Sequence, residues 1–385
     1  MRTNYGAPLR KWLREQGLEL VVDFGALPIF PEATAYPCIV RLRKGSKRKS
    51  FTACNVKRLA DLDLEALVRT EGTEVAFSSL TDSGWTLTGG AEQRLLEKLR
   101  KTGTPLGEYV GGKIYRGILT GLNEAFVIDA ATRERLIAQD PKSAEIVKPF
   151  LLGRDVKRYR SPVSGRYLIL FPKGWTSKKF GSTDEEGAWK RLESDYPAIA
   201  GHLRPFADRG GKRCDRGEFW WELRECAYYE EFEKPKIIIP AIVQKGSYAF
   251  EAEGFYSNDK TTIIAMDDLY LLGLLNSKVT DFFIHAIAST KQGGYYEYKP
   301  MYLVQIPIRA IDFAVPEEKE RHDRIVALVE RMLRLHQEPP EPASPEENEN
   351  RLRKIAATDA EIDSLVSNLY GLTAEEICIL AENRS

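Results

Sequence analysis

The side chains that could do chemistry in this sequence are cations, amides and hydroxyls concentrated in its middle. Lys113, Arg116, Thr120 and Asn123 precede a basic run that begins at Arg154. Lysine and arginine hold phosphate oxygens, and hydroxyl and amide groups add hydrogen bonds to phosphates, sugars or base edges. The residue types therefore predict contact with a polyanion rather than a bond-breaking centre.

Two later segments could extend such a surface. Lys173-Gly174-Trp175 could hold a phosphate and pack on a sugar or base edge, although closure of the core by Trp175 is an equal alternative. Lys291-Gln292 begin a loop with two glycines, and these side chains can address guanine and adenine, respectively. A plain mobile loop is the alternative there. The candidate contacts are Lys113, Arg116, Thr120, Asn123, Arg154, Lys157, Arg158, Lys173, Lys291 and Gln292.

Other chemistries find little support in the sequence. The five cysteines are never spaced as CxxC, which argues against structural zinc and favours a reducing cytoplasm. Glu317-Glu318-Lys319 has the residue types of a metal-dependent nuclease, but acids at the beginning of a helix also suit the helix dipole. We therefore expect no catalytic, metal-binding or cofactor-binding residues in this chain.

Charge is balanced overall but unevenly distributed. The 385 residues include 56 basic and 56 acidic side chains, and 43% are hydrophobic, which suits two or three globular units. From Arg154 to Arg191 there are ten Lys/Arg against four acids, whereas from Glu341 onward there are ten acids against four Lys/Arg. This predicts a phosphate-facing middle and an end that points elsewhere; solvated faces of differing sign are the alternative. The beginning lacks a signal-peptide core, so we expect a cytoplasmic protein.

The stretch 111–160 has a definite order of predicted elements. Alternating apolar residues predict a strand over 113–118, a polar turn follows at 120–123, and 125–128 reads as an apolar strand. A helix should begin near Thr132 and end at Asp140, because the following proline disfavours helical geometry. A basic loop completes the order. An ordinary α/β segment with a polar hairpin is the bland alternative.

This order of residues resembles a known family. The similar positions are Gly117-Ile118, Thr120-Gly121, Asn123, Ala125-Phe126, Lys148-Pro149, Leu151, Gly153-Arg154-Asp155 and Arg158-Tyr159. They resemble the TaqI-like C-terminal specificity domain, the target-recognition part of adenine-specific DNA methyltransferases and type IIG restriction–modification enzymes. Residues 5–42 resemble the end of a methyltransferase catalytic domain, and 265–377 also resemble this group of proteins.

The resemblance implies sequence-specific recognition of double-stranded DNA next to a methyltransferase catalytic domain, in the same polypeptide or as a separate chain. S-adenosylmethionine would belong to that catalytic part. Neither a glycine-rich FxGxG turn nor an [Asn/Asp]-Pro-Pro-[Tyr/Phe] tetrapeptide occurs in this sequence, so we expect this chain alone to be inactive in methyl transfer. The alternative is a stand-alone specificity subunit that docks a separate methyltransferase through C-terminal helices.

The end of the chain predicts paired helices. Apolar residues recur at helical spacing over 317–336 and again over 352–369, with a Pro/Glu-rich linker between them, which predicts an antiparallel hairpin. Further patterns predict a helix over 189–203 and a strand over 303–308. The expected fold class is α+β: a mixed-sheet recognition domain followed by the hairpin. The predicted units are 1–50 (end of the methyltransferase-like domain), 51–105 (connector), 106–312 (recognition domain) and 313–385 (hairpin and a short helix).

Overall fold

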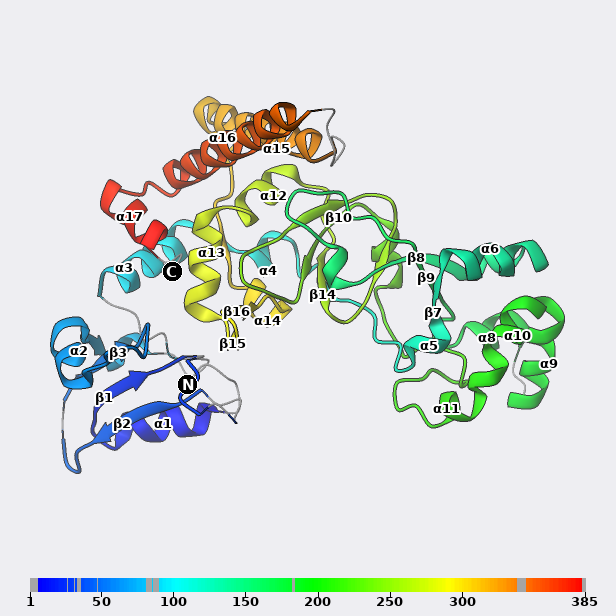
Figure 1. The fold of residues 1–385 in the computed structure, drawn as a ribbon, viewed down its shortest axis with the longest axis horizontal. Helices are drawn as coiled ribbons and strands as arrows, with labels where there is room; N and C mark the ends of the chain where they lie inside the picture. Colours follow the sequence, from blue (N-terminus) through cyan, green and yellow to red (C-terminus); the bar gives the residue numbers. More distant parts are fainter. Residues whose placement is uncertain are drawn as a thin grey trace.

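The computed structural model describes residues 6–25, 27–30, 32, 36–46, 48–80, 85, 90–181, 184–337 and 344–382. The molecule is elongated, with an N-terminal unit at one end, a central body crossed by two long helices, and a helical lobe at the other end (Figure 1). Helices and mixed sheets are both present, and the last long helices form the expected pair, which confirms the α+β prediction.

The N-terminal unit is built on a sheet of order β2-β1-β3-β4. Strand β1 runs antiparallel to β2 and parallel to β3, and β3 is antiparallel to β4. Small apolar clusters form on it, one around Leu13 and Trp85 and another around Val22 and Phe24. The elements are α1 (Ala7–Glu15), β1 (Leu18–Asp23), β2 (Cys38–Leu42), β3 (Ser50–Asn55), α2 (Leu64–Glu71) and β4 (Thr73–Ala76).

The central body contains an antiparallel sheet of order β12-β10-β14-β6. Strand β10 is buried along its whole length, and its Lys236 forms an ion pair with Glu251 of β12 in which both side chains are inaccessible to solvent. The elements leading into and forming this sheet are α3 (Gly90–Thr102), β5 (Thr104–Pro105), α4 (Leu106–Tyr109), β6 (Ile114–Arg116), β10 (Lys236–Pro240), β12 (Ala249–Glu251) and β14 (Thr261–Ile264).

A second sheet, of order β13-β8-β9-β7, carries the distal lobe. Sequence predicted a strand over 125–128, but the chain makes one helical turn there before the strand begins at Val127. The helix predicted over 189–203 is divided in two, because Pro197 begins a new helix. The elements are α5 (Asn123–Phe126), β7 (Val127–Asp129), α6 (Ala130–Gln139), α7 (Ser143–Ile146), β8 (Val147–Leu151), β9 (Arg166–Ile169), α8 (Trp175–Phe180), α9 (Glu185–Asp195), α10 (Pro197–Leu203), α11 (Ala207–Gly211) and β13 (Tyr256–Ser257).

The last third of the chain returns to the central body. The strand predicted over 303–308 is wrong in its first half, because Pro300 begins a helical turn and pairing with β5 begins only at Pro307. The elements are β11 (Ile242–Val243), α12 (Leu269–Leu275), α13 (Lys278–Ile287), β15 (Thr290–Lys291), β16 (Tyr295–Glu297), α14 (Pro300–Leu303), β17 (Pro307–Ile308), α15 (Pro316–Gln337), α16 (Pro345–Leu369) and α17 (Ala374–Glu382).

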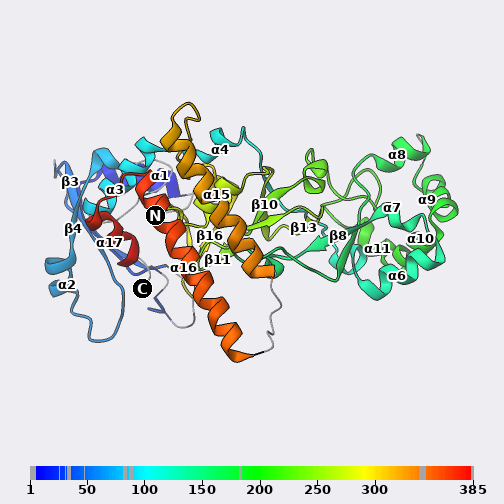
Figure 2. The same cartoon turned by 90° about the horizontal axis from the view of Figure 1, so that it is seen from above.

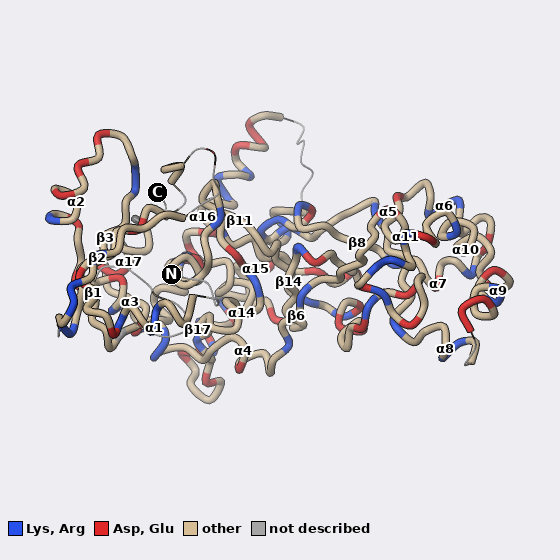
Figure 3. Tube along the Cα trace, turned by 90° about the horizontal axis from the view of Figure 1, so that it is seen from below, with Lys and Arg blue, Asp and Glu red and all other residues tan. Residues whose placement is uncertain are grey.

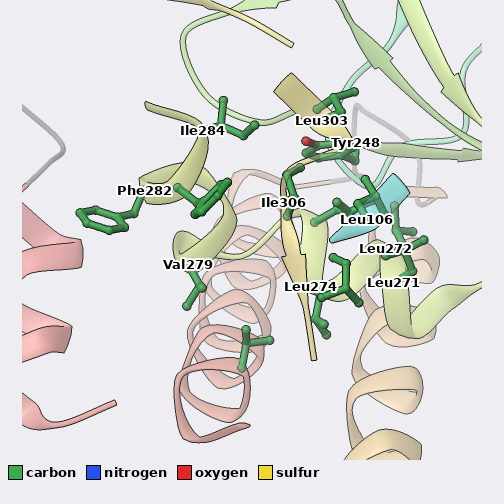
Figure 4. Packing of buried hydrophobic residues seen from close by; sticks show 14 of the residues in the cluster. Leu106, Tyr248, Leu271, Leu272, Leu274, Val279, Phe282, Ile284, Leu303 and Ile306 are labelled. Atoms are coloured by element: carbon green, nitrogen blue, oxygen red, sulfur yellow. The ribbon is translucent and has the colours of Figure 1, made fainter. Parts of the chain in front are cut away.

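Helices α15 and α16 cross the central body side by side (Figure 2). The apolar side of α15 is buried in the same core as α12 and α13, whose packing Figure 4 shows. A Cβ atom on Gly273 of α12 would lie 2.9 Å from methyl carbons of both Ile325 and Val329, so the glycine permits the close approach of α15. The hairpin is therefore packed as part of the central core, while the boundary predicted at 312 remains a prediction.

Candidate nucleic-acid interface

Loops from both sheets meet at the junction between the central body and the distal lobe. The backbone of Gly117 donates to Thr261 O (3.0 Å), and that of Ile118 donates to Ser257 O (2.7 Å). A Cβ atom on Gly117 would lie only 1.8 Å from Asn258 O, so only glycine fits there. This close approach places the segment after β6 directly against the turn 257–260.

Arg116 emerges at this junction, half exposed. Its Nη2 lies 2.9 Å from Asp259 Oδ2, and the same carboxylate oxygen lies 3.0 Å from the Lys260 Nζ. One acid is thus shared by two cations, which leaves a local excess of positive charge. Lys113, at the other end of β6, is also exposed. Figure 3 shows basic positions recurring around β6, β8 and β14, with acidic positions between them.

Thr120 and Asn123 shape the loop. Thr120 is buried, and its hydroxyl lies 2.5 Å from the Asn123 side-chain oxygen, while Asn123 itself is exposed. The buried Arg213 donates to the Thr120 carbonyl and to Trp220 O (2.7 Å), and its guanidinium lies over the Phe126 ring. Burial lowers the pKa of Arg213 to about 10, so it stays charged at neutral pH. Of Thr120 and Asn123, only Asn123 is accessible to a ligand.

The turn at Lys173-Gly174-Trp175 is already occupied by an internal anion. The buried Glu222 carboxylate accepts hydrogen bonds from the backbone of Gly174 (3.0 Å) and Thr176 (2.9 Å). Trp175 packs against Phe171, Phe180 and Tyr196, so the core-closing alternative describes its position. Lys173 remains exposed and forms an ion pair with Glu225 (2.9 Å). A phosphate would find the backbone donors of this turn taken, whereas the Lys173 ammonium is accessible.

The basic run beginning at Arg154 divides between surface and interior. Arg154 and Lys157 are exposed, and within the described ranges neither side chain has an ion pair or hydrogen bond. Arg158 turns inward, where its Nη2 donates to Asn276 O and to Asp359 of α16, both at 2.6 Å. Tyr159 is fully buried at φ 57°, a conformation that non-glycine residues rarely adopt. The backbone around Lys157 is held by hydrogen bonds from Tyr159 N to Tyr248 O (3.0 Å) and from Arg160 N to Lys157 O (3.1 Å).

The segment predicted as a glycine-containing loop at 291–296 is a short β-hairpin, β15–β16, paired to β11. Its tip is held by the Gln244 side chain, which donates to Gly293 O at 2.9 Å. Lys291 lies 3.1 Å from Glu297, which also pairs with Lys299 at 2.7 Å. Burial works against ionisation of Glu297, but the two lysines outweigh it and lower its pKa. Gln292 is exposed at the tip.

The structure thus brings some of the predicted contacts together. Ala241 donates to Lys260 O (2.8 Å) and accepts from Tyr298 N (2.9 Å), so the turn bearing Lys260 lies beside the base of the β15–β16 hairpin. Arg116 lines one hollow together with Arg224 and Tyr228, and Lys173 forms its ion pair with Glu225, another residue of that lining. Arg158 stands apart in the interior. Sequence reasoning did not select Arg224 or Tyr228; the aromatic run 219–229 was the available signal.

Within the described ranges, no three His, Cys, Asp or Glu side chains form a group able to hold a metal ion. None of the helices in those ranges combines the length and apolar character needed to cross a bilayer.

Comparison with known protein families finds a match to part of this chain. The model of the TaqI-like C-terminal specificity domain matches residues 148–308. This span contains most of β8, the basic run, Lys173, the turn 257–260 and the β15–β16 hairpin. The match confirms the resemblance predicted from the motifs.

Two named proteins are similar to this chain over most of its length. The type II methyltransferase M.PaeR7I of Pseudomonas aeruginosa is 24% identical over 339 residues, covering 83% of this chain and 56% of the relative. The type II restriction enzyme and methyltransferase RM.Eco57I of Escherichia coli is 22% identical over 408 residues, covering 97% of this chain and 40% of the relative. The chain therefore spans about half the length of these relatives.

A solved structure shares the fold. The type IIL restriction–modification enzyme MmeI, determined in complex with DNA, matches with a TM-score of 0.54 at 13% sequence identity, over 99% of this chain and 48% of that chain. At this identity the likeness concerns the arrangement of elements.

Proposed function

We propose that this chain recognises a short sequence in double-stranded DNA, as the target-recognition part of an adenine-N6 DNA methyltransferase in a restriction–modification system. The observation that carries the proposal is that the specificity-domain match at 148–308 includes the junction turn and the β15–β16 hairpin, where cations and an amide are exposed. Relatives named as type II methyltransferases support the same assignment.

Methyl transfer itself is assigned to a catalytic part, in the same polypeptide or in a separate chain. Binding of S-adenosylmethionine and rotation of the target adenine out of the duplex require motifs that this sequence lacks. In this proposal, the present chain selects the site and holds the duplex, and the catalytic part transfers the methyl group.

The exposed side chains fall into two roles by their chemistry. Lys113, Arg154 and Lys157 are exposed cations, which suits contacts to backbone phosphates; such contacts contribute affinity but do not read the sequence. Gln292 and Asn123 present amides, which can pair with an adenine edge in the major groove. Lys291 stands beside Gln292 but shares Glu297, so its charge is partly offset.

The alternative of an adaptor that docks a methyltransferase through its C-terminal helices has less support from the packing. The apolar stripe of α15, including Ile325, Val329 and Met332, is buried in the central core. Only the outward face of the hairpin is available, with Leu352 as its exposed large apolar residue among those described. Among the described residues, more large apolar side chains are exposed in the N-terminal unit, for example Leu9 and Trp12.

The test is selection of randomised duplexes by the isolated chain at two salt concentrations, followed by sequencing of the bound pool. We expect a short enriched motif and affinity that falls steeply as salt rises. Binding without a motif would indicate that recognition needs the catalytic part. Failure to bind at low salt would contradict the proposal.

A further inference from the structure

A small hollow lies at the junction and is lined by two arginines and two tyrosines. We call it the junction pocket; its lining includes Arg116 at the end of β6 and the next residue, Gly117, together with Arg224, Glu225, Tyr228 and Tyr229, and it has a volume of about 110 Å³. These two segments are more than a hundred positions apart in sequence, as the hydrogen bond between Tyr228 and Arg116 illustrates. The pocket therefore exists only in the folded chain.

Each tyrosine holds the backbone of one arginine. The Tyr228 hydroxyl donates to Arg116 O at 3.1 Å, and the Tyr229 hydroxyl donates to Arg224 O at 2.9 Å. The Tyr228 ring also stacks on Tyr115, with centroids 4.4 Å apart and planes 16° apart. Because both hydroxyl protons are used within the protein, the guanidinium groups supply the free donors of the pocket.

The charges around the pocket favour an anion. Arg116 shares Asp259 with Lys260, and Arg224 has a single long contact to Asp215 at 3.3 Å. The one acid in the lining, Glu225, is paired with Lys173 at 2.9 Å, and the hydrogen bond from Lys173 lowers the pKa of Glu225. About half of each guanidinium side chain remains exposed, with relative accessibilities of 54% for Arg116 and 52% for Arg224.

We propose that the junction pocket binds one phosphate group of the DNA backbone between the guanidinium groups of Arg116 and Arg224. The inference rests on the proposed DNA-recognition function. A planar guanidinium offers parallel N–H donors that match phosphate oxygens, and each of these arginines uses only some of its donors within the protein. Arg116 and Arg224 thereby position the duplex and carry no sequence information.

The experiment measures DNA affinity against salt concentration for the whole chain and for the variants Arg224→Ala and Arg116→Ala. Loss of one phosphate contact should weaken binding on the order of tenfold at low salt and reduce the slope of log affinity against log salt by about one. The loss should be equal for all sequences, so the selected motif should not change. Arg224→Lys should retain part of the affinity, because it keeps the charge without the paired donors.

Arg204→Ala is the matched control, because Arg204 is likewise an exposed arginine in the distal lobe with a carboxylate partner, Glu193. It should leave affinity and slope unchanged. Thermal unfolding of each variant checks that the fold is intact.

The outcomes separate the two proposals. A wild-type chain that fails to bind DNA would remove the proposed function itself. A wild-type chain that binds, with pocket variants equal to it or selecting a different motif, would overturn the phosphate assignment alone. Inorganic phosphate, compared with chloride at equal ionic strength, gives a further arm. Stronger competition against wild type than against Arg224→Ala would show that the pocket takes free phosphate; equal competition with a reduced salt slope would show that it takes phosphate only within the duplex.

Discussion

Arg116 and Arg158 come from the same predicted contact set, yet the structure uses them in opposite ways. Arg116 lies half exposed at the junction, where its acid partner is shared with Lys260. Arg158 lies between the central body and α16, with its guanidinium bonded to Asn276 O and Asp359. The same residue type is thus left half exposed in one place and is bonded to internal groups in the other.

The region around Arg158 is a partly buried polar network, defined here by Arg158, Asp359, Asp281, His285 and Tyr298, of which Asp281 and Tyr298 are buried. Asp281 accepts from Gly246 N (2.8 Å) and from the Tyr298 hydroxyl (3.2 Å), which also lies 3.3 Å from His285 Nε2. The negative charge of Asp281 also helps to raise the pKa of Arg158, so the two parts of the network interact electrostatically. Charges in this network should matter to stability, whereas those of the junction should matter to binding.

The largest effect is expected for Arg158→Ala. Removing the guanidinium leaves Asp359 and the Asn276 carbonyl without their partner in a largely desolvated place, which should lower the free energy of unfolding by about 2–4 kcal/mol. Denaturant unfolding measures this. Arg158→Ala combined with Asp359→Asn should be less destabilising than the two single changes added together. Unchanged stability with reduced DNA affinity would instead place Arg158 with the junction cations.

Asp281 and His285 should make the free energy of unfolding depend on pH, and their effects should have opposite signs. Burial raises the pKa of Asp281 to about 6, so its folded form binds a proton that the unfolded chain does not, and this contribution to stability grows as pH falls from about 6 to 4. Burial lowers the pKa of His285 to about 4, so its contribution is lost as pH falls through the same range. The two contributions oppose each other in the wild-type chain.

Asp281→Asn should remove the opposing contribution of Asp281 and leave the loss of stability at acidic pH that His285 causes. The variant should lose stability more steeply than wild type between pH 6.5 and 4.5, with a difference of roughly 2 kcal/mol at the acidic end. Denaturant unfolding at both pH values measures it, and Glu361→Gln, a change at a partly exposed acid paired with Arg324, serves as the control. Parallel pH profiles for Asp281→Asn and wild type would show that Asp281 does not titrate in this range.

Arg116→Ala should have a small effect on stability. An exposed ion pair contributes about 1 kcal/mol or less, and Lys260 remains to accompany Asp259. Denaturant unfolding should therefore give a curve close to wild type, in contrast to Arg158→Ala. A loss as large as that of Arg158→Ala would remove the distinction between the two regions.

The smallest effect is expected for Lys173→Ala. Its partner Glu225 is strongly exposed, and the turn beside it is held by Glu222 rather than by the lysine. The unfolding midpoint should not change measurably. A shift of the midpoint would mean that the Lys173–Glu225 pair supports the turn after all.

Much of the fold was predictable where local patterns are long. The stripe over 317–336 predicts α15, observed at Pro316–Gln337. Short apolar runs failed, because four residues such as 125–128 do not distinguish a helical turn from a strand. There the choice is made by packing: Ala125 and Phe126 are fully buried, and His202 of α10 bonds to Ala125 O.

The candidate interface was predictable only in part. Residue types selected Arg116 and Gln292 as candidate contacts, and both are exposed. They also selected Arg158, which is instead hydrogen-bonded to Asp359. Arg224 was not selected, because nothing in its local sequence links it to Arg116. The DNA-binding roles of all these residues remain predictions for the experiments above.

By itself, the sequence determined which elements are amphipathic, where cations are concentrated and which motifs are present, since these depend on residues close together in the chain. Only the tertiary structure decided which cations remain exposed and which are paired in the interior. That choice depends on burial and on partners distant in sequence, such as Asp359 for Arg158 and Asp259 for Arg116. Whether a charged side chain is paired or left exposed depends on the groups that folding places next to it, and the local sequence does not specify these groups.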